Sequence, residues 1–373
     1  MDLRPFDHTP RTRIVFGNGT LSRVGELVQA NGGSRALIVS DPGIVKAGYS
    51  AKAVASIEEA GLRAAIFGEV HENPSTLDVD HCVSAAREFG ADFIIGLGGG
   101  SSMDTAKGCN FILTNGGRMH DYWGVGKATQ SMLPMIAIPT TSGTGSECQS
   151  FALISDAETH VKMACGDPKA AARVAILDPE LTLSQPERVT ACTGIDALAH
   201  ALETAVTTKR NALSALYSRE GFRLCHAGFS RVLRDPKDVE ARGMMLLGAA
   251  YAGTAIENSM LGAAHSCANP LTAYFDVVHG EAVGVMLPHV IRFNSLVPEI
   301  AAIYESYFDG DLADRVQELL WEAKMPRTIS HYGIADADLG KLAAMAAQQW
   351  TAQFNPRVIT EADFVEVYRV ALG

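Results

Sequence analysis

The chain has 373 residues, of which 47% are hydrophobic and 20% are charged, a balance typical of a folded enzyme. This length is sufficient for two domains, each with its own core. The formal net charge of −11 and the lack of a basic run argue against nucleic acid or an anionic membrane surface as a partner. No apolar run approaches the roughly 18 residues that a membrane-spanning helix needs.

Cysteine usage and the start of the chain predict a cytoplasmic protein. The seven cysteines are scattered and form no Cys-x-x-Cys pair, which favours a reducing compartment in which they act as small hydrophobic residues. Residues 1–5 contain no apolar stretch, so we expect no secretory signal.

The first half of the chain alternates short apolar runs with helical segments. The runs that predict strands are residues 12–17, 36–40, 64–67, 93–96, 135–139 and 174–177. The segments that predict helices are residues 21–30, 51–60 and 77–89, and residues 151–154 and 161–163 predict a hairpin around a turn at 156–159. This alternation predicts a parallel sheet covered by helices on both faces.

A glycine-rich segment, residues 96–107, directly follows the strand at 93–96 and opens a helix. Glycines let a backbone approach a ligand closely, and the N–H groups at a helix start suit a phosphate. The segment does not match Gly-x-Gly-x-x-Gly, because Ser101 occupies the sixth position, and the acidic strand end Asp41 precedes the glycines instead of following them. A nucleotide site of different connectivity is therefore favoured over the alternative, a tight strand–helix turn.

A second loop, residues 140–147, follows the strand at 135–139 and is rich in hydroxyl groups and glycine. Its hydroxyl groups could hold ribose, phosphate or the nicotinamide amide. The alternative is a flexible Ser/Gly loop, but a position after a buried strand favours ligand contact.

The sequence pattern changes near residue 181. Long runs rich in Ala and Leu then predict helices at residues 187–206, 211–233, 238–265, 280–295, 311–323 and 335–354, and no convincing strand remains. We therefore expect an α/β dinucleotide-binding domain at 1–180 and an all-helical metal and substrate domain at 181–373.

Two residues in the first of these helical runs could bind a metal ion. Asp196 and His200 are four residues apart, so a helix, with Thr193-Gly194 as its expected start, places them on one face. Such a spacing is common by chance. The metal interpretation is favoured because these polar side chains interrupt an apolar helix, where an uncompensated charge is costly.

Two further histidines could complete the site. We expect His265 at the end of one helix, which Asn269-Pro270 breaks, and His279 at the start of the next, so that both can converge on the same face. A buried histidine is otherwise most often a hydrogen-bonded core residue. One Asp and three His together suit Fe²⁺ or Zn²⁺.

Five motifs, in order along essentially the whole chain, make the sequence resemble the iron-containing (group III) alcohol dehydrogenase family. The motifs are Gly98-Gly99-Gly100-Ser101 with Asp104, residues 139–147, residues 175–179, residues 193–200, and His279-Gly280 followed by Leu287-Pro288-His289. The resemblance implies the fold of iron alcohol dehydrogenases and dehydroquinate synthase. In that fold an α/β nucleotide-binding domain and an all-α metal-binding domain have the active site between them.

The resemblance also implies the site residues. The metal, usually iron and sometimes zinc, would be bound by Asp196, His200, His265 and His279. The implied cofactor positions are Asp41, Asn73, Gly98, Gly99, Gly100, Ser101, Asp104, Thr140, Thr141, Thr144 and Lys162. The Asp41 carboxylate can accept hydrogen bonds from the adenosine ribose and would repel a 2′-phosphate, so we expect NAD(H) to be favoured over NADP(H); the alternative is that Asp41 only starts a turn.

The sequence departs from the family pattern in two places. Asn269 stands where the family usually has a second histidine near the nicotinamide, so this position offers no imidazole as a proton relay. Cys148-Gln149 replaces the usual Val-Thr after Glu147.

The resemblance implies a metal-dependent, NAD(P)-dependent alcohol dehydrogenase or aldehyde reductase, and a homo-oligomer, specifically a dimer. Hydride would pass between nicotinamide and a small alcohol, aldehyde or ketone substrate held by the metal. One alternative is a lyase of the dehydroquinate-synthase type that uses NAD transiently, which the small number of basic residues disfavours. A non-catalytic binding protein is disfavoured because the metal ligands and the glycine loop are both intact.

Overall fold

The computed structural model describes residues 4–159 and 161–373, which form two compact units. The sheet unit consists of Thr9–Thr141 and Gly145–Gln185. The helical unit consists of Pro186–Gly373, Ser142–Thr144 and the described residues up to His8. Residues 1–3, part of the segment on which the expectation of no secretory signal depends, lie outside the described residues.

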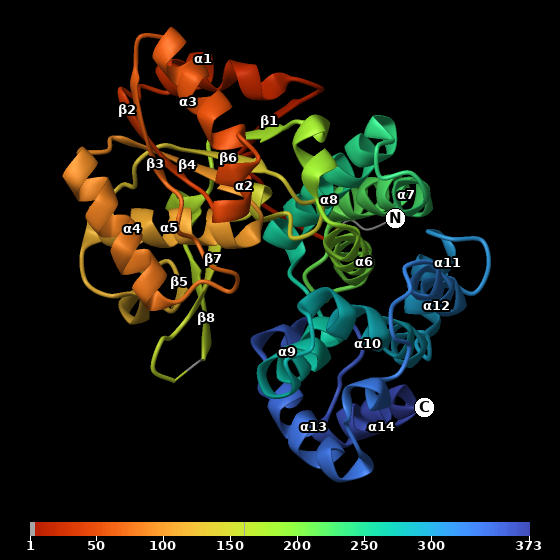
Figure 1. The fold of residues 1–373 in the computed structure, drawn as a ribbon. Helices are drawn as coiled ribbons and strands as arrows, with labels where there is room; N and C mark the ends of the chain where they lie inside the picture. Colours follow the sequence, from red (N-terminus) through yellow and green to blue (C-terminus); the bar gives the residue numbers. More distant parts are fainter. Residues whose placement is uncertain (1–3, 160) are drawn as a thin grey trace. The chain divides into compact units, whose positions relative to one another are not determined.

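Every strand in the described residues belongs to the sheet unit (Figure 1). Six strands form one parallel sheet in the order β1-β9-β6-β4-β2-β3, which confirms the parallel sheet predicted from the sequence. Their bounds are β1 Arg13–Phe16, β2 Arg35–Val39, β3 Arg63–Phe67, β4 Phe93–Gly98, β6 Met135–Pro139 and β9 Val174–Leu177.

Helices cover both faces of this sheet. Successive strand side chains point to opposite faces, so in β2 Leu37 and Val39 join a core with α4 and α5, whereas Ala36 and Ile38 join a core with α1 and α3. Figure 1 shows these two helix pairs on opposite sides of the sheet. The helices of this unit are α1 Val24–Ala30, α2 Pro42–Lys46, α3 Tyr49–Glu59, α4 Thr76–Phe89 and α5 Gly100–Asn115.

A second, three-stranded sheet has the order β5-β8-β7. Its strands are β5 Gly124–Val125, β7 Phe151–Ser155 and β8 Lys162–Gly166, and the antiparallel pairing of β7 with β8 confirms the predicted hairpin. Asp156 stabilises the turn, because its Oδ1 accepts hydrogen bonds from the N–H groups of Glu158 and Thr159.

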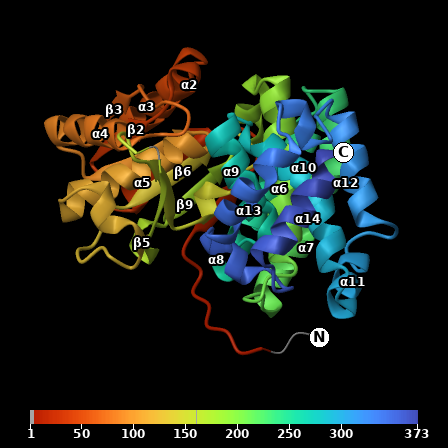
Figure 2. The same cartoon turned by 90° about the horizontal axis from the view of Figure 1, so that it is seen from below.

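The helical unit has no strand in its described residues, as expected. Figure 2 shows α6 within the bundle, where it contacts α7, α8 and α10. The helices of this unit are α6 Glu187–Thr204, α7 Ala212–Arg234, α8 Val239–Ser259, α9 Ala263–Phe275, α10 His279–Asn294, α11 Pro298–Glu305, α12 Leu312–Glu322, α13 Leu339–Ala347 and α14 Glu361–Leu372.

The expected start of α6 at Thr193-Gly194 is wrong, since the helix begins at Glu187. Gly194 lies inside the helix, where a Cβ atom would come within 2.6 Å of the Phe229 ring of α7. The glycine is therefore needed for close packing of α6 on α7, and its modest helix propensity does not end the helix.

The expected single helix at 238–265 is also wrong. Helix α8 ends at Ser259, Met260 has a positive φ of 74°, and a new helix, α9, places His265 in its first turn. Pro270 does not break α9 but lies within it. Pro270 and Leu271 are both buried, and their burial is a favourable contribution against the backbone hydrogen bond that proline lacks.

The predicted run at 335–354 is interrupted. Helix α13 ends at Ala347, and Gln349 has an extended backbone that precedes a 3₁₀-helix at Trp350–Phe354. Helices α11 and α14 were not predicted.

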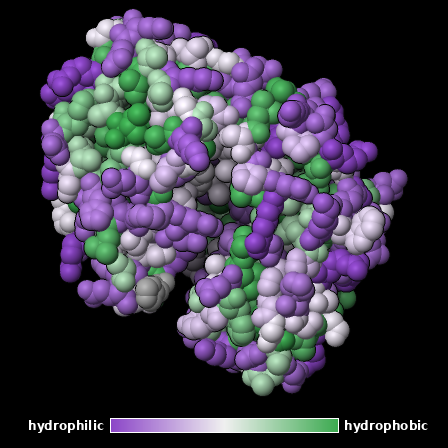
Figure 3. Space-filling model, viewed as in Figure 1, coloured by the Kyte–Doolittle hydropathy of each residue, from purple (hydrophilic) through white to green (hydrophobic). Residues whose placement is uncertain are grey.

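Charged and polar side chains cover much of the face shown in Figure 3, and hydrophobic side chains occur in smaller groups on each unit. In the part of the chain that the structure describes, no helix combines the length and apolar character needed to cross a membrane.

Candidate metal centre and nucleotide site

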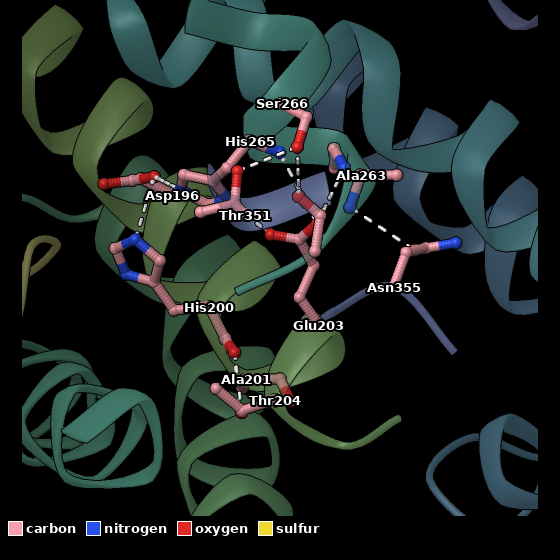
Figure 4. Close-up of polar contacts among 12 residues, drawn as sticks. Asp196, His200, Ala201, Glu203, Thr204, Ala263, His265, Ser266, Thr351 and Asn355 are labelled. Carbon is pink, nitrogen blue, oxygen red and sulfur yellow. Dashed lines mark hydrogen bonds and ion pairs between the residues drawn. The ribbon is translucent and has the colours of Figure 1, made fainter. Parts of the chain in front are cut away.

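Two potential metal ligands lie one turn apart on α6 (Figure 4). Both Asp196 and His200 are buried, and Asp196 Oδ1 lies 3.4 Å from His200 Nε2. His200 Nδ1 lies 3.2 Å from the carbonyl oxygen of Gly143, an acceptor. When Nδ1 donates to this acceptor, the lone pair of Nε2 faces the carboxylate.

Helices α9 and α10 bring two more histidines to the same carboxylate. The Nε2 atoms of His265 and His279 lie 3.3 Å and 4.0 Å from Asp196 Oδ1. Potential ligand atoms of Asp196, His265 and His279 all lie within 4.8 Å of one another. The fold thus gathers side chains from three helices around one carboxylate.

Two atoms at this centre support coordination. Asp196 Oδ1 and His265 Nε2 are buried and have no hydrogen-bond partner in the described residues. Leaving such groups uncompensated is costly, and a divalent cation would satisfy both. A donor set of one carboxylate and three imidazoles suits Fe²⁺ or Zn²⁺, so these residues fit the metal that the sequence analysis predicts.

The electrostatics of the centre also favour a cation. Burial by itself would raise the pKa of Asp196, but the neighbouring imidazoles of His200, His265 and His279 hold that pKa well below its usual value. Burial lowers the pKa of His200, which favours the neutral ring that a metal requires. Burial also opposes a charge on His265, but the carboxylates of Glu203 and Asp196 raise its pKa to about 10. A bound cation would therefore replace a proton of the His265 imidazole.

Glu203 is a residue of this centre that the sequence analysis did not predict. Its Oε2 atom forms a hydrogen bond with Nδ1 of His265. Asp196, His200 and Glu203 are spaced i, i+4 and i+7 along α6, which places them on one helix face. That spacing was the available signal.

In the sheet unit, expected cofactor residues gather at the carboxyl ends of β2, β4 and β6. Asp41 follows β2, and its Oδ2 lies 3.1 Å from the point where a Cβ on Gly98, at the end of β4, would stand. The strand order reverses between β2 and β4, because β3 pairs with one edge of β2 and β4 with the other. Open parallel sheets bind ligands at such a reversal.

The glycine segment forms the start of α5. Gly98 has a φ of +153°, and a side chain there would come within 2.3 Å of Ser102 Oγ. Gly99 is the N-cap, and no side chain caps this helix start in the described residues. The N–H groups of the first turn, which includes Gly100 and Ser101, therefore suit a phosphate.

The hydroxyl-rich loop is held in place by buried charges and is not a flexible linker. Lys107 is fully buried, and its Nζ donates to the carbonyl oxygen and Oγ of Ser146 at 2.6 and 2.8 Å and to the carbonyl oxygen of Phe151 at 2.9 Å. Ser146 Oγ donates to Asp104 Oδ1 at 3.0 Å. The carboxylate of Asp104 therefore contacts this loop, and burial raises its pKa.

The other expected cofactor residues fall into separate groups. The N–H of Thr140 donates to the carbonyl oxygen of Gly98 at 2.9 Å, and Thr141 lies beside Gly99. Lys162 Nζ donates to Asn73 Oδ1 at 3.3 Å. Thr144 belongs to the helical unit.

Comparison with known proteins covers the whole chain. The model of the family "Iron-containing alcohol dehydrogenase" matches residues 10–179, and that of "Fe-containing alcohol dehydrogenase family, C-terminal" matches residues 190–372. NAD-dependent methanol dehydrogenase from Bacillus methanolicus is 33% identical over 371 residues, covering 96% of this chain and 97% of that protein. The chain belongs to the iron-containing alcohol dehydrogenase family.

Solved structures agree with this assignment. A 1,3-propanediol oxidoreductase has a TM-score of 0.93 at 31% identity, covering 99% of this chain and 100% of that one. Sulfoacetaldehyde reductase from Bifidobacterium kashiwanohense, solved with NAD⁺, has a TM-score of 0.90 at 26% identity and covers 99% of both chains. The predicted family and fold class are confirmed, and the protein is a metal-dependent, nicotinamide-linked alcohol dehydrogenase, an oxidoreductase.

Proposed function

We propose that this alcohol dehydrogenase binds its catalytic cation through Asp196, His200, His265 and His279. The observation that carries the proposal is that Asp196 Oδ1 and His265 Nε2, two buried atoms without a hydrogen-bond partner in the described residues, lie 3.3 Å apart. When bound, a divalent cation supplies Lewis-acid polarisation of the substrate oxygen. We expect Fe²⁺, with Zn²⁺ as the alternative, because both accept carboxylate and imidazole ligands.

The protein's own contribution to this centre is orientation. The carbonyl oxygen of Gly143 and the carboxylate of Glu203 bind the Nδ1 atoms of His200 and His265, so that both Nε2 atoms are directed toward Asp196. Asp196, His200 and His265 are buried, and electrostatic interactions are stronger at a site with little contact with bulk water.

We propose that residues 1–180 bind NAD(H) in preference to NADP(H), and that residues 181–373 carry the metal and the substrate. The first turn of α5, with Gly98, Gly99, Gly100 and Ser101, would bind the phosphates, and Asp41 would accept hydrogen bonds from the adenosine ribose. The remaining proposed cofactor residues are Asn73, Asp104, Thr140, Thr141, Thr144 and Lys162.

Small alcohols and the corresponding aldehydes or ketones are the proposed substrates. The relatives named for methanol and 1,3-propanediol support short primary alcohols. We also propose a homodimer, from the family resemblance, and a cytoplasmic location, because all seven cysteines are buried thiols that form no disulfide.

A spectrophotometric screen tests the proposed function. The purified protein is stripped of metal, reloaded with Fe²⁺ or Zn²⁺ and assayed for NADH oxidation with short aldehydes, 2-hydroxyaldehydes and ketones. We expect one NADH consumed per substrate reduced, and no turnover without metal. Product formation without net NADH consumption would instead indicate a lyase that uses the cofactor transiently.

A further inference from the structure

Helix α9 begins without a cap of its own. Its N-cap residue is Gly262, which has no side chain to accept a hydrogen bond. The first N–H groups of a helix lack acceptors within the helix. Here Asn355 Oδ1 lies 3.3 Å from the N–H of Ala263, and Glu203 Oε1 lies 2.7 and 3.4 Å from the N–H groups of Ala264 and His265 (Figure 4). Side chains from distant parts of the chain therefore cap α9.

The second carboxylate oxygen of Glu203 has a different partner. Oε2 forms a hydrogen bond with Nδ1 of the His265 ring. The Glu203 side chain is only 4% exposed, so water does not compete for either oxygen. One carboxylate thus binds both the backbone and the ring of the same residue.

This arrangement determines which ring nitrogen of His265 is left for a ligand. A carboxylate accepts hydrogen bonds, so Nδ1 carries the proton. In the neutral ring the lone pair is then on Nε2, the atom that lies 3.3 Å from Asp196 Oδ1.

We propose that Glu203 is a positioning residue of the metal centre. It holds His265 in the tautomer and orientation that bind the cation, and it fixes the first turn of α9 to α6, the helix that carries Asp196 and His200. This inference rests on the metal ligands proposed above. Carboxylate partners of metal-binding imidazoles have this effect in general, and their loss lowers metal affinity about 10- to 100-fold.

A purely structural role as the cap of α9 is the competing explanation, and Glu203→Gln separates the two. The carbonyl oxygen of glutamine can still accept from the N–H groups of Ala264 and His265. Its NH₂ group then faces Nδ1 of His265 and donates to it, which moves the ring proton to Nε2. The cap is retained, but the ligand atom is blocked.

The experiment compares the wild type with Glu203→Gln, Glu203→Ala and His265→Ala. We measure the Zn²⁺ dissociation constant by competition with a fluorescent chelator, and the Tm of the metal-free proteins. For Glu203→Gln we expect the dissociation constant to rise about 10- to 100-fold, while the metal-free Tm falls by less than in Glu203→Ala because the cap of α9 is kept. Glu203→Ala should weaken Zn²⁺ binding and also lower the Tm of the metal-free protein.

Asp311→Asn is the matched control. Asp311 Oδ1 caps α12 by accepting from the N–H of Asp314 at 2.9 Å, so this variant makes the same carboxylate-to-amide change at a helix start that carries no proposed ligand. It should leave Zn²⁺ affinity unchanged. Wild-type affinity in Glu203→Gln, or a Tm loss in Glu203→Gln equal to that in Glu203→Ala, would overturn the proposal. Wild-type affinity in His265→Ala would instead overturn the proposed ligand set.

Discussion

Nε2 of His265 lies 3.3 Å from Oδ1 of Asp196, although the two residues belong to different helices, α9 and α6. The same oxygen lies 3.4 Å from Nε2 of His200 and 4.0 Å from Nε2 of His279. Asp196 is thus the common neighbour of three imidazoles, and two of them, His265 and His279, lie in the first turns of α9 and α10.

Replacing His265 or His279 by alanine should strongly lower bound metal and activity, since each change removes one of four proposed ligands. The two variants should differ in the stability of the metal-free protein. His265 is buried and its loss leaves Glu203 without the imidazole, which we expect to cost about 1–3 kcal/mol. The His279 side chain is 35% exposed, so its replacement by alanine should lower the free energy of unfolding only slightly. Metal analysis and calorimetry check both statements; full metal occupancy with normal turnover in both variants would contradict the ligand set.

Gly280→Ala should disturb the metal centre from outside it. A Cβ at Gly280, the second residue of α10, would lie 2.2 Å from the carbonyl oxygen of Cys192 on α6. The start of α10, with His279, must then move away from α6, so we expect weaker metal binding and a loss of about 1–3 kcal/mol in the free energy of unfolding. Gly340→Ala in α13 is the control, since in the described residues no heavy atom beyond its chain neighbours and the backbone of its own helix lies within 4 Å of its Cβ position. Equal metal affinity and equal stability of the two variants would show that the close contact at Gly280 affects neither property.

Asp41 combines two roles that substitutions can separate. Its Oδ1 accepts the N–H of Ile44 at 3.0 Å and so caps α2. Asp41→Asn should keep the cap and lose the charge, whereas Asp41→Gly loses both. We expect both variants to shift binding from NADH toward NADPH, with Asp41→Asn nearly as stable as the wild type. Fluorescence titration measures both affinities, and tighter binding of NADPH than of NADH by the wild type would overturn the proposed preference.

Glu147 should make the sheet unit more stable in acid than in base. Burial raises its pKa from 4.5 to about 7, so between these values the folded state binds more protons than the unfolded state. The stabilisation is therefore complete below about pH 4.5 and is lost as the pH rises through about 7. Glu147→Gln should raise the Tm at pH 8, by the equivalent of at most about 3 kcal/mol, and raise it much less at pH 5. Calorimetry at both pH values tests this, and an equal change at both would exclude titration of Glu147 as the cause.

Local patterns predicted much of the fold. The inner strands β2 and β4 of the parallel sheet are buried on both faces, so they are continuous apolar runs that are visible in the sequence. The Asp196–His200 pair follows from helix geometry alone, because both residues belong to one helix.

Features that depend on tertiary contacts were not predictable in the same way. Gly194 lies inside α6, where it leaves room for the Phe229 ring of α7. Pro270 lies inside α9, where it is buried. The role of Glu203 required knowledge that α9 starts at Ala263 without a cap of its own. Each case depends on a contact with a partner distant in the sequence. Propensity does not identify such a partner, and spacing places Glu203 on the ligand face of α6 without showing that it caps α9.

Asn269 lies one turn after His265 on α9, at the position where the family usually has an imidazole. Its Nδ2 donates to Oε1 of Gln349 at 2.9 Å. Asparagine donates and accepts hydrogen bonds but cannot transfer a proton near neutral pH. An imidazole in its place could donate to the same Oε1 atom and titrate near neutrality. We therefore expect Asn269→His to retain metal and to add an ionisation near neutral pH to the turnover profile.

Three variants test the role of the hydrogen-bonded side chains of Asn269 and Gln349 in the reaction. Asn269→Ala and Gln349→Ala both remove the hydrogen bond between the two side chains, but only the first removes the group next to His265 along the helix. If Asn269 orients substrate or cofactor, Asn269→Ala should raise KM more than Gln349→Ala does, with metal content unchanged in both, because neither residue is a proposed ligand. The pH dependence of kcat for Asn269→His is the third measurement. An unchanged profile in Asn269→His, together with wild-type kinetics in Asn269→Ala, would show that this position takes no part in the reaction and that the asparagine serves only to pack α9 against Gln349.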